Sequence, residues 1–119
     1  MKVAVIGASN KPHRYSYQAV MLLKEKGYEV YPVHQKIKDI EGIQVYSSIT
    51  NIADSLDTVT LYVNASISNL IGNDILAKKP KRIIFSPGAE NTELEAKARD
   101  KGINTINGCT LVMLKTGQF

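Results

Sequence analysis

The sequence predicts an α/β fold in which a parallel sheet of about five strands lies between two layers of helices. Short apolar runs rich in β-branched residues alternate with amphipathic segments along the whole chain. Strands separated by helices pair in parallel through right-handed crossovers, which gives a doubly wound, three-layer α/β/α arrangement. The chain has 119 residues, about the length of one ordinary domain, so we expect residues 1–119 to form a single domain.

The first half of the chain supplies two of the expected strands and one helix. The elements are, in order, a strand at 3–6, a helix at 16–26, a strand at 29–33, an irregular polar segment at 34–48 and helical turns at 51–56. The first strand is apolar throughout, which is typical of a strand buried on both faces. Gly27 is a natural end for the helix, and Pro32 is expected to mark the exit of the second strand.

The second half continues the alternation. It predicts a strand at 58–63, a helix from 67 to 76, a strand at 82–85, a helix at 92–101, a strand at 103–106 and a short helix at 109–114. Ser66 is the expected N-cap of the first of these helices, and Pro80 follows its end. The strand at 58–63 is rich in β-branched and aromatic residues, as strands generally are.

Composition narrows the class of protein. The 15 basic and 11 acidic side chains are interspersed, which favours a mixed solvated surface over a nucleic-acid-binding face. A single cysteine excludes a disulfide within the chain and a cysteine-based metal cluster. The apolar runs are far shorter than the roughly 18 residues that a membrane helix requires, and the start of the chain does not resemble a secretory leader. We therefore expect a cytoplasmic protein with no membrane partner and no metal.

The loop after the first strand carries the strongest functional signal. In open α/β folds, ligands bind beyond the carboxyl ends of the strands. Here the segment 7–12 (Gly-Ala-Ser-Asn-Lys-Pro) links the first strand to a helix, so its small residues allow backbone amides to approach a phosphate. Lys11 and Arg14 can pair with phosphate oxygens. An ordinary strand-to-helix turn uses the same residue types, so position alone leaves both interpretations open.

The residues around this loop also bear on which nucleotide could bind. A dinucleotide fingerprint needs three glycines and, about 20 residues on, an acidic residue for the ribose. Only Gly7 is present, because Ser9 and Pro12 stand where the later glycines would be. The second strand ends without a carboxylate, which disfavours NAD and leaves NADP or coenzyme A (CoA). The phosphate-loop pattern of ATP hydrolases is also absent.

Several segments together resemble one known family. They are Gly7-Ala8-Ser9 with Pro12, Ser16-Tyr17, the stretches 27–33 and 42–48, Ser86-Pro87-Gly88 and the region of Cys109. This combination resembles the small CoA-binding proteins, which are similar to the N-terminal CoA-binding domain of the succinyl-CoA synthetase alpha subunit. The resemblance implies a Rossmann-like CoA-binding domain standing alone, with coenzyme A or an acyl-CoA as its ligand.

The resemblance also implies a set of binding residues. The phosphates would lie against the glycine loop and the following helix, at Gly7, Ala8, Ser9, Asn10, Lys11 and Arg14. The adenine and ribose would lie near the end of the second strand, at Pro32, Val33 and His34. The rest of the ligand would pass the third strand at Tyr62, Val63 and Asn64 and reach Pro87 and Gly88 with its pantetheine arm. Tyr15 is a further candidate, as a side chain that covers the ligand.

Two departures from the family limit what can be transferred. Many relatives carry an arginine or proline after the third strand, where this chain has 64–66 (Asn-Ala-Ser). Many relatives also have a Glu-His pair after the cysteine, and the residues that follow Cys109 include neither. Succinyl-CoA synthetase chemistry needs a phosphorylated histidine in a separate domain. We therefore expect no catalytic residues.

Three functions remain open at this point. The first is a non-enzymatic carrier, sensor or regulatory protein that binds CoA or an acyl-CoA. The second is an NADP-binding small oxidoreductase or a subunit of one. The third is a thiol redox switch in which Cys109 captures CoA as a mixed disulfide. In each case the partner is a small-molecule nucleotide cofactor, and a homodimer or a protein partner is left open.

Overall fold

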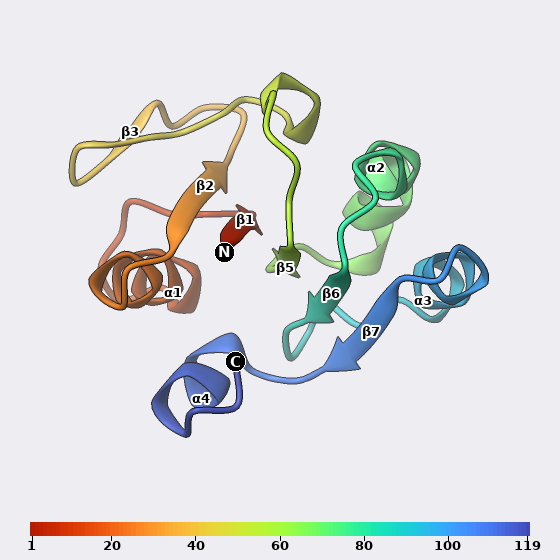
Figure 1. Cartoon of the computed structure of the whole chain (residues 1–119). Coiled ribbons are helices and arrows are strands. Elements are labelled where there is room, and N and C mark those ends of the chain that lie inside the picture. Colours follow the sequence, from red (N-terminus) through yellow and green to blue (C-terminus); the bar gives the residue numbers. More distant parts are fainter.

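A five-stranded parallel sheet forms the centre of the computed structural model, which describes all residues 1–119 (Figure 1). Its strands are β1 (Lys2–Ile6), β2 (Glu29–Val33), β5 (Thr58–Leu61), β6 (Arg82–Phe85) and β7 (Asn104–Asn107). They lie in the order β2-β1-β5-β6-β7. The chain therefore starts in the sheet, turns to β2 on one side and then crosses to β5 on the other. The predicted Rossmann-like, doubly wound fold is confirmed.

Strand β1 shows why its sequence is apolar throughout. It pairs with β2 on one side and with β5 on the other, so it has no exposed edge. Ala4 and Ile6 belong to one buried cluster, whereas Val3 and Val5 belong to the other. Because successive side chains of a strand point to opposite faces, both faces of the sheet are covered at this strand.

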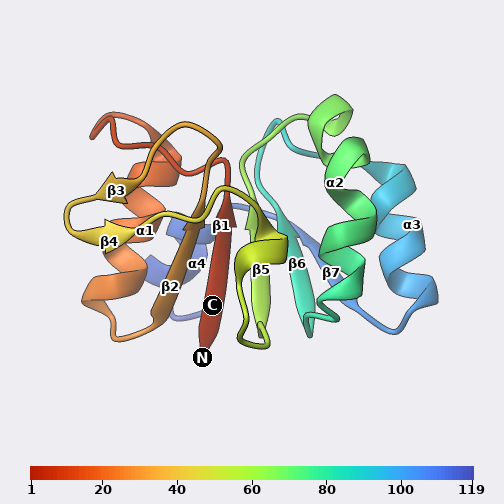
Figure 2. The same ribbon diagram turned by 90° about the horizontal axis from the view of Figure 1, so that it is seen from above.

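Two pairs of helices cover these faces (Figures 1 and 2). Helices α1 (Tyr15–Glu25) and α4 (Thr110–Lys115) contact each other on one side, and α2 (Ala65–Ala77) and α3 (Thr92–Asp100) contact each other on the other. A buried hydrogen bond of 2.7 Å between the hydroxyls of Thr60 and Thr110 ties α4 to the sheet. None of the helices has the length and apolar character needed to cross a lipid bilayer.

The segment expected to be irregular contains a small hairpin. Strands β3 (Asp39–Ile40) and β4 (Ile43–Gln44) pair antiparallel around a turn at Gly42, whose φ is +84°. Beyond the hairpin, the N–H of Tyr46 donates to the carbonyl of Pro32 at 2.8 Å. Pro32 therefore lies inside β2 and not at its exit. Proline is tolerated here because β2 is the edge strand of the main sheet.

The structure corrects several other boundaries. The helical turns expected at 51–56 are instead a 3₁₀ turn at Ile49–Asn51. The N-cap of α2 is Asn64 and not Ser66, since the Asn64 side-chain oxygen accepts the N–H of Ile67 at 3.1 Å. Strand β5 ends at Leu61, two residues before the expected end, because the chain must turn into this earlier helix.

The two edges of the main sheet differ. The end of β2 is bridged by Tyr46, whereas β7 lies at the outer end of the sheet and pairs only with β6 (Figure 1). The side chains of β7 are tied to α3: Arg99 donates to the hydroxyl of Thr105, and Asn107 donates to Glu95, both at 2.8 Å. Strand β7 is short, and its polar side chains at Thr105 and Asn107 are hydrogen-bonded to α3.

Candidate functional site

Strands β1 and β5 are parallel neighbours, and the connections that follow them lead to opposite edges of the sheet. A pocket opens beside this point at the carboxyl ends of the strands. Connections that leave neighbouring strands in opposite directions leave a crevice between them. The cavity has a volume of about 720 Å³. Its lining consists of Gly7, Ala8, Ser9, Asn10, Lys11, Arg14, Tyr15, Ser16, His34, Ile37, Tyr62, Val63 and Pro87.

The loop after β1 is held closely against both neighbouring strands. The N–H groups of Gly7 and Ala8 both donate to the carbonyl of Val33, at 3.1 and 3.2 Å. Gly7 has a φ of +85°, and a Cβ atom at this position would lie 2.8 Å from Cγ1 of Val63 and 3.1 Å from the carbonyl oxygen of Tyr62. Only glycine fits this close approach without displacing the end of β5.

Several backbone amides around the pocket have no acceptor in the protein. They belong to Ser9 and Asn10 in the loop and to Tyr15, Ser16 and Tyr17 in the first turn of α1. The N-cap residue of this helix, Arg14, makes no side-chain capping bond. The first turn of α1 therefore presents free donors and the positive end of its dipole, which together suit a phosphate or another anion.

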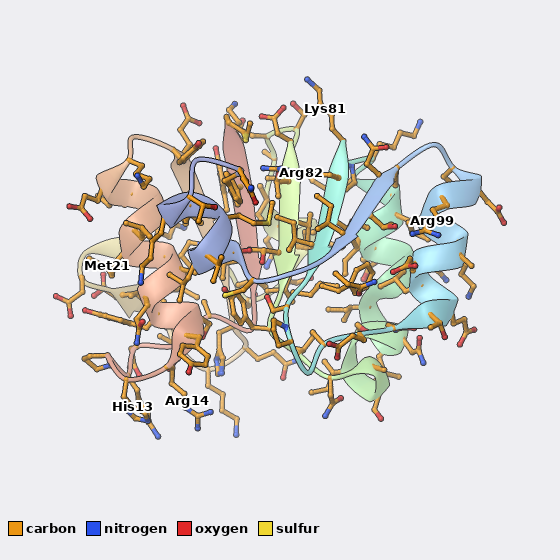
Figure 3. The ribbon with its side chains drawn as sticks, turned by 90° about the horizontal axis from the view of Figure 1, so that it is seen from below. His13, Arg14, Met21, Lys81, Arg82 and Arg99 are labelled. Carbon is orange, nitrogen blue, oxygen red and sulfur yellow. The ribbon has the colours of Figure 1, made fainter.

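The side chains of the pocket add positive charge. Lys11 and Arg14 line it, neither forms an ion pair, and no carboxylate is among the lining residues. Figure 3 shows Arg14 beside His13 at this end of the sheet, whereas Lys81 and Arg82 lie at the opposite end. Uncompensated cations in a concave surface attract anionic ligands.

Most of the expected binding residues come together here. Gly7, Ala8, Ser9, Asn10, Lys11, Arg14, Tyr15, His34, Tyr62, Val63 and Pro87 line the pocket, whereas Pro32, Val33, Asn64 and Gly88 do not. Those outside it have structural contacts: Val33 anchors the glycine loop, Asn64 caps α2, and the Gly88 N–H donates to Glu90 at 2.9 Å. Tyr15 is 70% exposed at the rim, where it could cover a ligand.

Sequence reasoning missed two lining residues, Ser16 and Ile37. Ser16 is the second residue of α1, so the expected helix N-terminus could have identified it. Ile37 is an apolar residue in an otherwise polar loop, and this contrast is the signal that could have pointed to a buried or ligand-facing position.

Two buried hydroxyls have no hydrogen-bond partner, and one of them belongs to Tyr62, which lines the pocket. The hydroxyls of Tyr62 and Ser86 are buried and make no hydrogen bond. Burial raises the pKa of the Tyr62 phenol, so this group stays protonated at neutral pH. Cys109 is half-buried at the N-cap of α4 and does not line the pocket.

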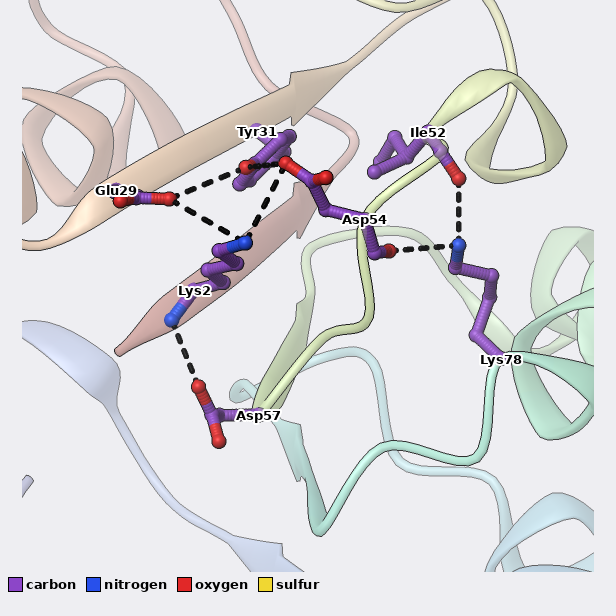
Figure 4. Close-up of polar contacts among 7 residues, drawn as sticks. All are labelled: Lys2, Glu29, Tyr31, Ile52, Asp54, Asp57 and Lys78. Carbon is purple, nitrogen blue, oxygen red and sulfur yellow. Dashed lines mark hydrogen bonds and ion pairs between the residues drawn. The ribbon is translucent and has the colours of Figure 1, made fainter.

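A second cluster of charged groups lies at the amino end of the sheet (Figure 4). The backbone N–H of Lys2 donates to Asp57 at 2.9 Å, and the Lys2 ammonium lies 3.5 Å from a carboxylate oxygen of Asp54. The Tyr31 hydroxyl donates to Asp54 at 2.6 Å, which lowers the pKa of Asp54 and raises that of Tyr31. The hydrogen bonds and charges of these polar groups are paired within the cluster, which indicates a structural role.

The comparisons with known proteins agree with the geometry of the pocket. A family model described as a CoA binding domain matches residues 1–115. An ADP-forming acetate–CoA ligase II subunit alpha from Pyrococcus furiosus is 37% identical over 62 residues, which make up 51% of this chain and 14% of the ligase subunit. The chain thus matches only a small part of that subunit's length.

Solved structures match over nearly the whole chain. A crystal structure of an uncharacterized protein has a TM-score of 0.89 and 41% identity, and the match covers 99% of this chain and 97% of that one. A hypothetical protein from Pyrococcus horikoshii OT3 has a TM-score of 0.90 and 30% identity, with 96% and 81% covered. Given the match of the family model to almost all of its residues, this chain belongs to the family of CoA-binding domains.

Proposed function

We propose that this chain binds CoA or an acyl-CoA in the pocket between β1 and β5, with the phosphates at the loop after β1 and the first turn of α1. One observation carries the proposal: free backbone amides lie beside the unpaired side chains of Lys11 and Arg14, with no carboxylate in the lining. These groups fit a multiply charged phosphate ligand, because each phosphate oxygen can accept from an amide or a cation.

The two ends of the ligand would extend in opposite directions from the phosphates. His34 and Ile37 form the part of the lining next to β2, which suits the adenosine part. Tyr62, Val63 and Pro87 form the part next to β5 and β6, which suits the pantetheine arm. In this orientation both the apolar and the hydrogen-bonding parts of CoA meet residues of matching chemistry.

We further propose that the role is non-catalytic, as a carrier, sensor or regulatory protein. The pocket offers amides, cations, hydroxyls and the imidazole of His34, and we assign all of these to binding and orienting a ligand. It offers no carboxylate or thiol beside the proposed position of the ligand. When bound, CoA would supply a thiol or a thioester, and the residues of the chain would hold it. A protein partner would then respond to the loaded pocket.

The direct test is a calorimetric titration of the purified protein with CoA, acetyl-CoA, NADP and NAD in one buffer. Micromolar binding of CoA, with no response to either nicotinamide nucleotide, is the expected result. Binding of NADP without CoA would overturn the proposal in favour of an oxidoreductase. If none of the four ligands binds, CoA binding by this chain is also refuted.

A Cys109→Ser variant tests the separate hypothesis of a thiol redox switch. Because Cys109 does not line the pocket, we expect this variant to bind CoA with unchanged affinity. Mass spectrometry after incubation with CoA disulfide measures the covalent adduct directly. A wild-type adduct that is lost in the variant, with noncovalent binding intact, would make the redox switch the better account.

A further inference from the structure

His34 is the first residue after β2, and its side chain is fixed by the loop that follows. Its ring nitrogen Nδ1 accepts the backbone N–H of Lys36 at 3.0 Å and that of Ile37 at 3.3 Å. Its own backbone N–H donates to the carbonyl of Tyr46 at 2.9 Å. A nitrogen that accepts hydrogen bonds has no proton of its own, so the single proton of this ring lies on Nε2.

The pocket around the ring contains cations and hydroxyls. The groups that share its pocket are Lys11 and Arg14 from the loop after β1, Tyr15 from α1 and Tyr62 after β5. Lys36 follows it in its own loop, and no acidic side chain lines the pocket. A second proton on the ring would place an N–H against two backbone N–H groups and add a cation among cations.

We propose that His34 is a binding and positioning residue of this site that acts in its neutral form. Nδ1 holds the loop so that Ile37 forms part of the pocket wall, and the Nε2–H, which has no partner in the protein, donates to an oxygen of the ligand. The ligand group is a ribose hydroxyl or a phosphate oxygen of a nucleotide. This inference rests on the proposed CoA function, because it assigns a contact within the same pocket.

The first test needs no ligand. Proton–nitrogen correlation spectra of the ¹⁵N-labelled protein distinguish a protonated from an unprotonated ring nitrogen. The chain has only two histidines, so a His13→Asn variant assigns the signals. At pH 7.5 we expect His34 with its proton on Nε2 alone. A proton on Nδ1, or a doubly protonated ring, would overturn the assignment.

The second test compares two substitutions that separate the roles of the two nitrogens. His34→Asn keeps an acceptor close to the position of Nδ1 but removes the distal donor. His34→Gln keeps a distal amide donor but removes the acceptor near the backbone. We expect each variant to bind CoA about three- to tenfold more weakly than the wild type at pH 7.5.

Calorimetry at pH 7.5 measures CoA binding by the wild type and both variants. A variant that binds CoA as tightly as the wild type would refute the role of the nitrogen that it removes.

The two experiments separate the possible failures. If CoA does not bind the wild type at pH 7.5 although the ring has the expected proton, the proposed function fails and the ligand contact fails with it. If CoA binds but the ring has its proton on Nδ1, only the assignment of His34 fails. Circular dichroism verifies that each protein is folded under the conditions of the titration.

Discussion

The two ends of the sheet use similar polar residues in opposite ways. At the amino end, Lys2 and Tyr31 both contact Asp54, and Lys78 donates to the backbone carbonyls of Ile52 and Asp54 (Figure 4). At the carboxyl end, Lys11 and Arg14 have no acidic partner and the nearby amides have no acceptor. Figure 3 shows Arg14 at the opposite end of the sheet from Lys81 and Arg82.

Pairing of the polar groups within the protein distinguishes a structural network from a candidate binding site in this fold. The groups of the amino end gain little from a ligand, because their hydrogen bonds and charges are already satisfied within the protein. Those of the carboxyl end are exposed to water and can exchange it for a ligand at little cost. Substitutions at the amino end should therefore change stability, whereas substitutions of side chains at the carboxyl end should change binding.

The largest effect is expected at Gly7, a pocket residue whose close packing also contributes to stability. Gly7→Ala forces a Cβ atom against Val63 and the carbonyl of Tyr62, at a φ of +85°. We expect a loss of about 3 kcal/mol in the free energy of unfolding, from strain and displaced packing together. Urea unfolding measures it.

Gly102→Ala is the matched control for Gly7→Ala. Gly102 also has a positive φ, +80°, but no atom lies within 4 Å of a Cβ built there. Its substitution should cost about 1 kcal/mol, from the backbone conformation alone. Equal losses at the two glycines would show that the close approach of the loop to β5 contributes nothing to stability.

A smaller effect, on binding alone, is expected for Lys11→Ala combined with Arg14→Ala. Each side chain can form a charge-assisted hydrogen bond with phosphate, so CoA affinity should fall at least about tenfold while unfolding changes by less than about 0.5 kcal/mol. Titration with CoA and dephospho-CoA measures the effect. A larger loss for CoA would assign the pair to the ribose 3′-phosphate, and an equal loss to the diphosphate.

The control for this variant removes two cations at the C-terminal end of α1, at Lys24 and at the C-cap residue Lys26. Lys24→Ala combined with Lys26→Ala changes the net charge equally but acts at the opposite end of α1, where both side chains are exposed. This variant should bind CoA like the wild type. If the two double variants lose the same affinity, the effect comes from overall charge and the local assignment is wrong.

The smallest effect is expected at Asp57, in the network of the amino end. The backbone N–H of Lys2 lowers the pKa of the Asp57 carboxyl below its ordinary value of about 4. A lowered pKa in the folded state means that the stabilisation is present above about pH 4 and is lost as the pH falls through the folded-state pKa. Asp57→Asn should therefore cost about 1 kcal/mol at pH 7 and progressively less in acid.

Urea unfolding at pH 7 and in acid measures this dependence. Asp74→Asn is the control, because Asp74 is exposed on α2 and forms no ion pair. That variant should match the wild type at both pH values. The Asp57→Asn variant should bind CoA like the wild type. A loss of CoA binding in this variant would contradict the assignment of stability to the amino end of the sheet and binding to the carboxyl end.

Much of the fold could be predicted from the sequence, because strand and helix patterns are local. The strands at 29–33 and 82–85 were predicted with the bounds that the structure has. The N-cap of α2 could not be decided in this way, because Asn64 and Ser66 are both good capping residues and the choice depends on where β5 ends. The hairpin of β3 and β4 was missed because its strands are only two residues long.

The candidate site stays a prediction, but its local part could be placed from the sequence. The loop after β1 adjoins the helix in sequence, so Gly7 to Lys11 were expected together, and they do line one pocket. The opposite wall was harder to predict, because Ile37 lines the pocket from a turn in which its N–H donates to His34. The resemblance implied Val33 and Asn64 as well, but both lie outside the lining and bond to the neighbouring backbone.

The open edge of β7 has a consequence for the behaviour of the protein in concentrated solution. An unpaired strand edge can recruit a strand from another molecule, and this is a common route to aggregation. The edge of β7 is only four residues long, and asparagines stand at both of its ends. Its side-chain bonds to Arg99 and Glu95 keep charged groups beside it. The short length and local bonds of β7 therefore disfavour its pairing with a strand of a neighbouring copy.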